Sequence, residues 1–572
     1  QAGGALSRRD LLGGACRAAL AAASLGLAGA AAAACAGPGQ AARGPSGPRR
    51  TTAATPGTGA GSATTEAAPA TTTSEAAPAT TTSEAATTTT TLAEPATLAE
   101  LAGVLHGQLV LPADSDYQAA SQVYDLRYAG ATPIAIAYCE SADDVARCIG
   151  FATAHGIAPI PRCGGHSYGG YSTGSGLVVD VSAMSATSFD AASSSAVVGA
   201  GTRLVDLYGA CAAAGALIPG GSCPTVGIAG LALGGGIGVL GRRYGLTCDN
   251  LLALELVSAE GRILTCSAES EPELFWACRG GGGRNFGIVT SFTFATHPIP
   301  QLTLFTLEWP WSQAPAVLAA WQSFMDGAPD ELWSNCQLLY EGTAGPHVRS
   351  SGVFAGSATA LTARLAAFAA AAGAPSYHTV DTDTYLRTML VEGGCDGLSV
   401  PECHLQGSLP GQAAAGTLSR AMFSAKSAYV ASAMPEGGVS AAVSAIDSLQ
   451  SAGAEVGAGL VLDAYGGAIN AVPAEATAFV HRDALFAVEM SMSFSPDAAP
   501  ESVTDGSGWL SSTAAALAPY CDGQAYQNYI DPTLSGWEEA YYGANLARLV
   551  KVKRAYDPDD VFSFAQSIPL SS

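Results

Sequence analysis

The sequence has few charged residues, and basic residues are the scarcer kind. Only 13% of the 572 residues are charged, and 48 aspartates and glutamates outnumber 25 lysines and arginines, for a formal net charge of −23. A surface this acidic repels polyanions, so the composition argues against nucleic-acid binding. Hydrophobic residues make up 48% of the chain, which is enough to build a core and excludes global disorder.

Cysteine is also sparse. The chain has 14 cysteines, and no two of them form the CxxC pair of a zinc ribbon. A Cys-dense disulfide scaffold is therefore excluded, and no metal site is predicted. Cys395 and Cys403, with His404 beside them, make an incomplete zinc site, so a disulfide between the two cysteines is the better prediction for an exported chain.

Residues 1–35 have the features of an export signal. Arg8 and Arg9 precede a leucine pair, and residues 18–34 form an uncharged, alanine-rich run. The pattern resembles a twin-arginine signal, whose route carries folded proteins, and it predicts an extracellular or envelope-attached protein. A run this short favours a cleaved signal over a retained anchor. Lipidation of Cys35, at the end of a degenerate lipoprotein box, would tether the chain to the envelope and stays open.

A low-complexity segment follows at residues 36–97. From residue 51 onward it consists mainly of Thr, Ala, Pro, Ser and Gly with a few Glu, and it repeats a nine-residue unit. Such a composition offers almost no large apolar side chains to bury, so it cannot form a core. We therefore expect a disordered linker, extended like a stalk, between the signal and a folded body.

The folded body begins with alternating strands and helices. Strands are predicted at 133–138, 157–160, 177–181, 196–199, 251–258 and 262–266, and helices at 141–155 and 204–214. Three glycine-dense loops, at 162–176, 220–241 and 280–287, lie between these elements. Because glycine lets a backbone approach a ligand closely, three such loops indicate a chain that wraps around a large cofactor.

Two short motifs in these loops point to other functions. Residues 236–241 satisfy the GxGxxG dinucleotide pattern, but they follow a glycine run rather than a buried strand. Residues 165–169 satisfy the GxSxG nucleophile elbow, which would make Ser167 the nucleophile of an α/β-hydrolase, yet Arg-Cys-Gly stands where the apolar central strand should end. The hydrolase stays open as an alternative, as does a non-catalytic envelope lipoprotein.

Several separated segments point together to one family. They are 162–170, 221–227, 244–250, 282–289, 476–482, 528–532, 541–546 and 556–558. In order and spacing they resemble the berberine-bridge-enzyme-like FAD-linked oxidases of the vanillyl-alcohol-oxidase, or PCMH-type FAD-binding, superfamily. The motifs are most similar to those of the bicovalent carbohydrate oxidases. The resemblance extends from about residue 122 to residue 569.

The resemblance implies an α+β fold in three parts. A PCMH-type FAD-binding domain would span 122–300, and a substrate domain with an antiparallel sheet covered by helices would span 301–525. A C-terminal segment at 526–572 would return to the FAD-binding domain and complete the cofactor site. Within the substrate domain the sequence predicts a helix at 358–372 and sheet-like segments at 408–427 and 485–494.

The implied cofactor is FAD, attached at two ring positions. His166 matches the histidine that bonds the flavin 8α-methyl group, and Cys223 matches the cysteine that bonds ring carbon 6. Val226 matches a position where valine leaves O2 a path to the flavin, which favours an oxidase over a dehydrogenase. The other residues matched to the cofactor site are Arg162, Gly164, Gly165, Ser167, Gly169, Gly227, Gly230, Asp249, Gly287, Ile288, Val289 and Asn545.

Removal of hydride from a carbon that bears a hydroxyl group requires a base for the hydroxyl proton. In carbohydrate-oxidising relatives this base is a tyrosinate, which Tyr529 matches, while Tyr526 is near enough to be confused with it and Tyr168 matches a further active-site tyrosine. Asp463 and Glu489 are the candidate acidic partners. Glu489 stands where alkaloid-oxidising relatives keep a glutamate base and sugar-oxidising relatives a glutamine, so which group takes the proton stays open.

The sequence thus predicts an exported FAD-dependent oxidase. It would transfer hydride from an alcohol or hemiacetal carbon, most simply of a carbohydrate or glycoside, to bicovalently bound FAD, and O2 would be the acceptor that gives H2O2. An FAD-linked oxidase or dehydrogenase of a secondary metabolite is the alternative within the same family, because fold does not determine substrate.

Overall fold

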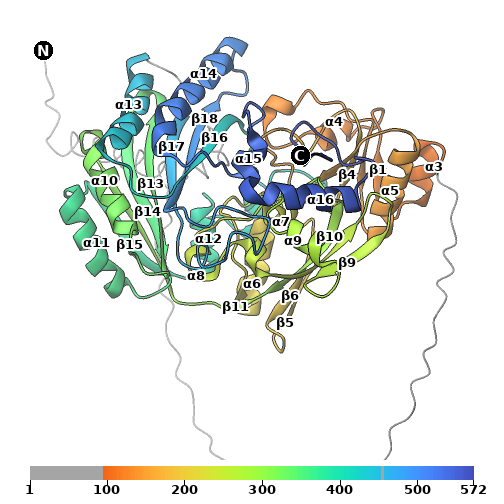
Figure 1. Ribbon diagram of the computed structural model, residues 1–572, viewed down its shortest axis with the longest axis horizontal. Helices are drawn as coiled ribbons and strands as arrows, with labels where there is room; N and C mark the ends of the chain where they lie inside the picture. The colour runs from red at the N-terminus through yellow and green to blue at the C-terminus, as the bar shows by residue number, and fades with distance from the viewer. Residues whose placement is uncertain (1–94, 453–456, 572) are drawn as a thin grey trace, which may run out of the picture. The chain divides into compact units, whose positions relative to one another are not determined.

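The computed structural model describes residues 95–452 and 457–571 (Figure 1). The predicted export signal, Cys35 and nearly all of the predicted linker lie outside these residues and stay predictions. The first described helix, α3 (Leu98–Val104), begins directly after Thr97, whose side-chain oxygen accepts the backbone N–H of Glu100 at 3.2 Å. In the part of the chain that is described, no helix combines the length and the apolar character needed to cross a membrane.

A small mixed sheet opens the described chain. Its strands are β1 (Gln108–Val110), β2 (Ala135–Tyr138), β3 (Pro159–Arg162) and β4 (Leu177–Asp180), in the order β1-β2-β4-β3. β2, β4 and β3 run parallel, and helix α5 (Ala142–Ala154) connects β2 to β3. Ser141 caps this helix because its side-chain oxygen accepts the backbone N–H of Asp144. The predicted β-α-β start is confirmed.

A second, antiparallel sheet follows. Its strands are β5 (Thr187–Asp190), β6 (Ser195–Gly199), β8 (Leu251–Val257), β9 (Ile263–Ser267) and β10 (Ile288–Ala295), in the order β5-β6-β10-β8-β9. The helices of this region are α4 (Tyr117–Ser121), α6 (Leu204–Ala214), α7 (Ile228–Leu233), α8 (Gly241–Tyr244) and α9 (Pro272–Ala277). A short ladder joins β7 (Ala216–Leu217) to β11 (His297–Pro298).

The third sheet is the largest and has seven antiparallel strands. They are β12 (Leu302–Trp309), β13 (Leu332–Glu341), β14 (Pro346–Phe354), β15 (Tyr377–Asp383), β16 (Met422–Val430), β17 (Gly457–Ala464) and β18 (Phe486–Phe494). Their order is β15-β12-β14-β13-β17-β18-β16. Figure 1 shows this sheet lined on its outer side by α10 (Ala314–Met325), α11 (Ala358–Ala372), α13 (Glu436–Ala452) and α14 (Pro500–Leu517). An antiparallel sheet covered by helices, as predicted, confirms the α+β fold class.

The segment predicted as sheet-like at 408–427 is a strand only from Met422, where β16 begins. Residues 408–421 form a loop because Pro410 lacks a backbone N–H for a ladder and Gly411 adopts a φ of +77°. Helix α12 (Tyr385–Glu392) leads into this region. The predicted disulfide between Cys395 and Cys403 is present there.

The C-terminal segment returns to the first part of the chain. Helix α15 (Trp537–Tyr542) is followed by α16 (Leu546–Tyr556), which packs on α9. Lys553 on α16 is fully buried, and its ammonium group donates to the backbone oxygen of Asn285 at 3.1 Å and to the carboxylate of Asp557 at 2.6 Å. A buried ammonium group has to be paired, so these contacts tie the C-terminal segment to the 280–287 glycine loop.

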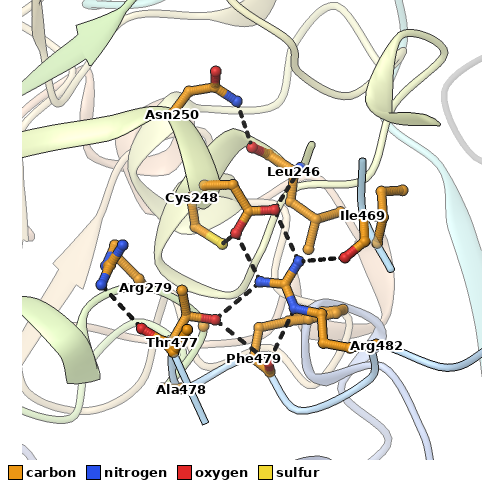
Figure 2. A network of polar contacts seen from close by, with 12 residues as sticks. Leu246, Cys248, Asn250, Arg279, Ile469, Thr477, Ala478, Phe479 and Arg482 are labelled. Atoms are coloured by element: carbon orange, nitrogen blue, oxygen red, sulfur yellow. Dashed lines mark hydrogen bonds and ion pairs between the residues drawn. The ribbon is translucent and has the colours of Figure 1, made fainter. Parts of the chain in front are cut away.

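Arg482 forms the centre of a buried polar network between distant segments (Figure 2). Its guanidinium group makes a two-pronged ion pair with Asp249, with N–O distances of 2.7 and 2.8 Å. The same group donates to the backbone oxygen of Ile469 and the side-chain oxygen of Thr477. Asp249 also accepts the backbone N–H of Leu246 at 2.9 Å. The network joins the chain after β17 to the chain before β8.

We predict that Asp249→Ala destabilises the protein by about 3–5 kcal/mol, because it leaves the buried Arg482 guanidinium without a counter-charge. Urea unfolding followed by tryptophan fluorescence measures the change. Glu260→Gln is the matched control, because it breaks an exposed ion pair. The side chain of Glu260 is 62% exposed and that of its partner Arg262 is 57% exposed, so we expect a loss of at most about 1 kcal/mol in the free energy of unfolding. Equal effects of the two substitutions would contradict the role given to the network.

Candidate active site

One large cavity, with a volume of about 290 Å³, lies where the glycine loops meet the large sheet. All three glycine-dense loops contribute lining residues, as does the C-terminal part of the chain at 526–530. The large sheet contributes Trp333 and Asn335 from β13 and Asp463 from β17. Asn335 and Asp463 are paired directly across the two strands, so their side chains share the sheet face opposite the covering helices.

Most of the residues matched to the cofactor site line this cavity. They are Arg162, Gly164, Gly165, His166, Ser167, Cys223, Val226, Gly227, Gly230, Gly287, Ile288 and Val289. Gly169, Asp249 and Asn545 lie elsewhere. An added Cβ at Gly169 would meet the ring of Tyr171 at 2.6 Å, so glycine allows close packing there.

Asp249 and Asn545 do not line the cavity but bind segments of the chain around it. Asp249 is the partner of Arg482 in the network described above. The Asn545 side-chain amide donates to the backbone oxygens of Ala474 at 2.8 Å and Thr477 at 3.1 Å. Both side chains thus tie the 469–482 segment to other parts of the chain.

The glycine loops form a cradle that fits a large bound group. An added Cβ at Gly164 would lie 2.5 Å from the backbone nitrogen of Gly227, so two loops approach each other more closely than any other residue permits. Gly165 has a φ of +71°, which glycine adopts without strain. At Gly230, by contrast, an added Cβ would meet nothing within 4 Å, because this residue faces the open cavity. Backbone walls with free space beside them suit a planar or phosphate-bearing cofactor.

His166 is held rigidly at the cavity wall. Its ring stacks on Tyr124 with centroids 3.9 Å apart, and its Nε2 atom pairs with the side-chain oxygen of Thr225 at 2.9 Å. Burial, together with the positive charges of Arg203 and Arg420, lowers the pKa of His166 to about 3. The imidazole is therefore neutral at physiological pH and keeps a nucleophilic nitrogen.

Three tyrosine rings lie in contact beside the sheet face, Tyr168 stacked on Tyr529 and Tyr526 edge-on to it. The ring of Tyr529 lies between those of Tyr168, with centroids 5.1 Å apart, and Tyr526, with centroids 4.9 Å apart. The Tyr526 hydroxyl oxygen accepts the backbone N–H groups of Gly236 and Ile237, at 3.0 and 3.4 Å, and is thereby committed to the 220–241 loop. The Tyr529 hydroxyl has no hydrogen-bond partner among residues 95–452 and 457–571.

Carboxyl groups with raised pKa values surround these tyrosines. Burial raises the pKa of Asp463 to about 7, against the effect of a hydrogen bond from Asn335. Burial and the charge of Asp463 raise the pKa of Glu489 to about 8, although Tyr168 donates to it at 3.2 Å. Asp463 lines the cavity, whereas Glu489 lies behind Tyr168 and is not part of the lining.

Several residues that line the cavity were not predicted from the sequence. Glu392, the last residue of α12, is one of them, and burial raises its pKa to about 7. Trp333 and Gln527 are others, and the buried indole N–H of Trp333 has no hydrogen-bond partner in the described chain. None of the three belongs to a motif with a chemical signature, although the polar positions on β13 are unusual for a buried strand.

The alternative motifs lack their structural context. The Ser167 side-chain oxygen accepts the backbone N–H of Tyr171 at 3.1 Å and has no hydrogen bond to a histidine within the described residues, so no catalytic triad is assembled. Residues 236–241 follow helix α7 and lead into α8 without a preceding strand, so they do not form a dinucleotide fingerprint.

Comparisons with known proteins agree with this geometry. Residues 133–267 match the model of an FAD binding domain, and residues 525–569 match the berberine and berberine-like model. An uncharacterized FAD-linked oxidoreductase of Bacillus subtilis, YgaK, is 31% identical over 473 residues, which cover 81% of this chain and 97% of the relative.

Two solved structures extend the comparison. Physcomitrella patens BBE-like 1 is 32% identical with a TM-score of 0.75, covering 83% of this chain and all of that one. The xylooligosaccharide oxidase from Myceliophthora thermophila C1, solved in complex with xylobiose, is 26% identical with a TM-score of 0.71, covering 81% and 97%. The FAD-binding fold, the glycine-walled cavity and these relatives together establish that the chain belongs to the berberine-bridge-enzyme-like family of FAD-linked oxidoreductases.

Proposed function

We propose that the protein oxidises an alcohol or hemiacetal carbon of a carbohydrate or glycoside and passes the electrons to O2, which becomes H2O2. One observation carries this proposal: a single cavity brings His166 and Cys223 together with Tyr529 and Asp463. Bound FAD would supply the two-electron acceptor there. Such an oxidation needs residues that hold the flavin, here His166 and Cys223, and a proton acceptor in the same cavity.

Covalent attachment of FAD through His166 and Cys223 is part of the proposal. Since Nε2 of His166 pairs with Thr225, Nδ1 is the nitrogen left for a bond to the flavin. The low pKa of His166 keeps the ring neutral, which is the form that attacks an electrophile. Cys223 lines the same cavity from the neighbouring glycine loop, as does Val226, which by resemblance leaves O2 a path to the flavin.

A polyhydroxylated substrate fits the free polar atoms of the cavity. The indole N–H of Trp333 and the hydroxyl group of Tyr529 have no partner in the described chain, so each would gain a hydrogen bond from a bound hydroxyl group. Sugar rings also pack well against aromatic side chains, and Trp333 lines the cavity. The similarity to a xylooligosaccharide oxidase supports the same substrate class.

A cationic natural product is the second candidate substrate. Three carboxyl groups, those of Glu392, Asp463 and Glu489, lie in or beside the cavity, and their ionised forms would attract an amine. A substrate panel that contains neutral oligosaccharides and cationic alkaloids distinguishes the two candidates.

Asp463 is the proton acceptor in our proposal. Its pKa of about 7 lets it act as a base near neutral pH, whereas burial and the nearby charge of Glu489 hold the pKa of Tyr529 well above its usual range. The Tyr529 hydroxyl group, which has no partner in the described chain, would form a hydrogen bond with the substrate oxygen. It would relay the hydroxyl proton of the substrate to Asp463. Glu489 is already engaged by Tyr168.

We predict that Tyr529→Phe lowers kcat for H2O2 release by about 100-fold or more while FAD remains bound, because the substrate oxygen loses its proton-transferring contact. A peroxidase-coupled assay on the substrate panel measures the effect. Tyr377→Phe, at an exposed position on β15, is the matched control and should retain full activity. Full activity in Tyr529→Phe would refute the role of Tyr529, and no H2O2 from any alcohol would refute the proposed reaction.

We also predict that the rate of flavin reduction rises with pH through about 7. Below its pKa of about 7 Asp463 is protonated and cannot accept a proton, and above it the ionised carboxylate can. Glu392 and Glu489 titrate in the same range, so the observed midpoint belongs to the whole cluster. Anaerobic stopped-flow absorbance gives the rate. In Asp463→Asn the rise should disappear, and an unchanged profile in that variant would assign the proton to another group.

A further inference from the structure

A second, smaller cavity lies on the other side of the loop that forms the wall of the large one. Its volume is about 40 Å³, and the two cavities share Tyr124, Arg162, Cys163, Gly164 and Gly165 in their linings. The rest of its wall comes from the 119–124 segment, from β2 and β4, from Ser182, Arg203 and Thr225, and from the 404–421 loop. A buried water needs about 10–15 Å³, so the space suits a few waters or one small ion but not a nucleotide.

Three guanidinium groups converge on this small cavity. They belong to Arg162, Arg203 and Arg420, which come from three separate segments of the chain. Asp180 is the one carboxylate in the lining, and it is engaged by Arg162. The remaining titratable lining groups, Tyr124, Tyr138 and Cys163, are neutral at pH 7, since burial raises the pKa of each. The cavity therefore carries a formal excess of two positive charges.

The N–H groups of these arginines are incompletely satisfied. Arg162 is 5% exposed, and its Nη1 atom is buried without a hydrogen-bond partner in the described chain. The buried Nε of Arg420 also lacks a partner, and Arg420 forms no ion pair within the described residues. Arg203 is better satisfied, since it donates to the backbone oxygen of Gly201 and to Ser182, each at 3.0 Å.

An excess of buried positive charge is costly, and a bound anion reduces that cost. Guanidinium groups present parallel N–H donors that match the oxygens of a phosphate, sulfate or carboxylate. We propose that the small cavity binds one inorganic oxyanion of the phosphate or sulfate class, held by Arg162 and Arg420 with Arg203 beside them.

The position of the site gives the anion a structural consequence. The 404–421 loop carries Arg420 and is fastened to the FAD-binding part at its ends, where His404 pairs with Asp206 at 3.0 Å and the backbone oxygen of Ala421 accepts from Leu126 at 2.8 Å. An anion between Arg420 and Arg162 would add a second attachment next to the C-terminal end of this loop. It would also stand behind the loop that carries His166.

Equilibrium dialysis of the full-length, flavin-loaded protein against inorganic phosphate tests the proposal, with chloride holding the ionic strength constant. We expect saturable uptake of one phosphate per chain and a thermal midpoint that rises with the logarithm of the phosphate concentration above the dissociation constant. Arg420→Gln should weaken uptake at least tenfold, and Arg420→Lys, which keeps the charge without the fork, should weaken it less. Arg262→Gln, at an exposed arginine that is not part of the cavity lining, is the matched control and should bind as the wild type does.

Four results would overturn the proposal. No saturable uptake by the wild-type protein would do so without any variant, even if Arg420→Gln fails to fold. Equal uptake by the wild type and a folded Arg420→Gln protein would show that the anion binds elsewhere. Uptake only by flavin-free protein would assign these arginines to the cofactor's own pyrophosphate. Sulfate in place of phosphate should give the same saturation, whereas saturation by chloride alone would contradict the oxyanion class.

Discussion

The close approach of two glycine loops is the constraint on which the rest of the site depends. Gly164 lies so near the backbone of Gly227 that no side chain fits between them, and this contact places His166 and Cys223 on the same cavity wall. The C-terminal part of the chain then closes the cavity, because the Tyr526 hydroxyl accepts backbone N–H groups of the 220–241 loop. Because Tyr526 is fixed in this way and its ring contacts that of Tyr529, it also positions Tyr529 at the cavity.

The other half of the site follows from the sheet face opposite the covering helices. Asn335 on β13 and Asp463 on β17 lie directly opposite each other on neighbouring strands. Burial raises the pKa of the Asp463 carboxyl group into the neutral range. Such a group is costly to ionise in the folded state, and it is useful as a base for the same reason. The smaller cavity has the opposite charge, because Arg162 and Arg420 bring positive charge to it beside the loop that carries His166.

The three glycine-dense loops could be predicted to surround a large bound group, because a glycine that lets two backbones meet leaves a local signature. The α+β fold class and many of the residues that line the cavity followed from the resemblance to a known family. It did not separate residues that line the cavity from residues that hold its loops: Asp249 sits in a motif but pairs with Arg482. Tyr526 and Tyr529 could not be told apart either, since the difference is which hydroxyl is already bonded. Glu392 was missed because its role arises only from where α12 ends.

The central claim is that the glycine-walled cavity holds FAD joined to His166 and Cys223. The most direct measurement is to denature the purified full-length protein in acid, digest it, and map the flavin by visible absorbance and mass spectrometry. Our account predicts that the yellow colour stays with the protein and that one flavin links the peptide containing His166 to the peptide containing Cys223. Release of all the flavin into the supernatant would contradict the covalent attachment, and a protein that contains no flavin would contradict the account as a whole.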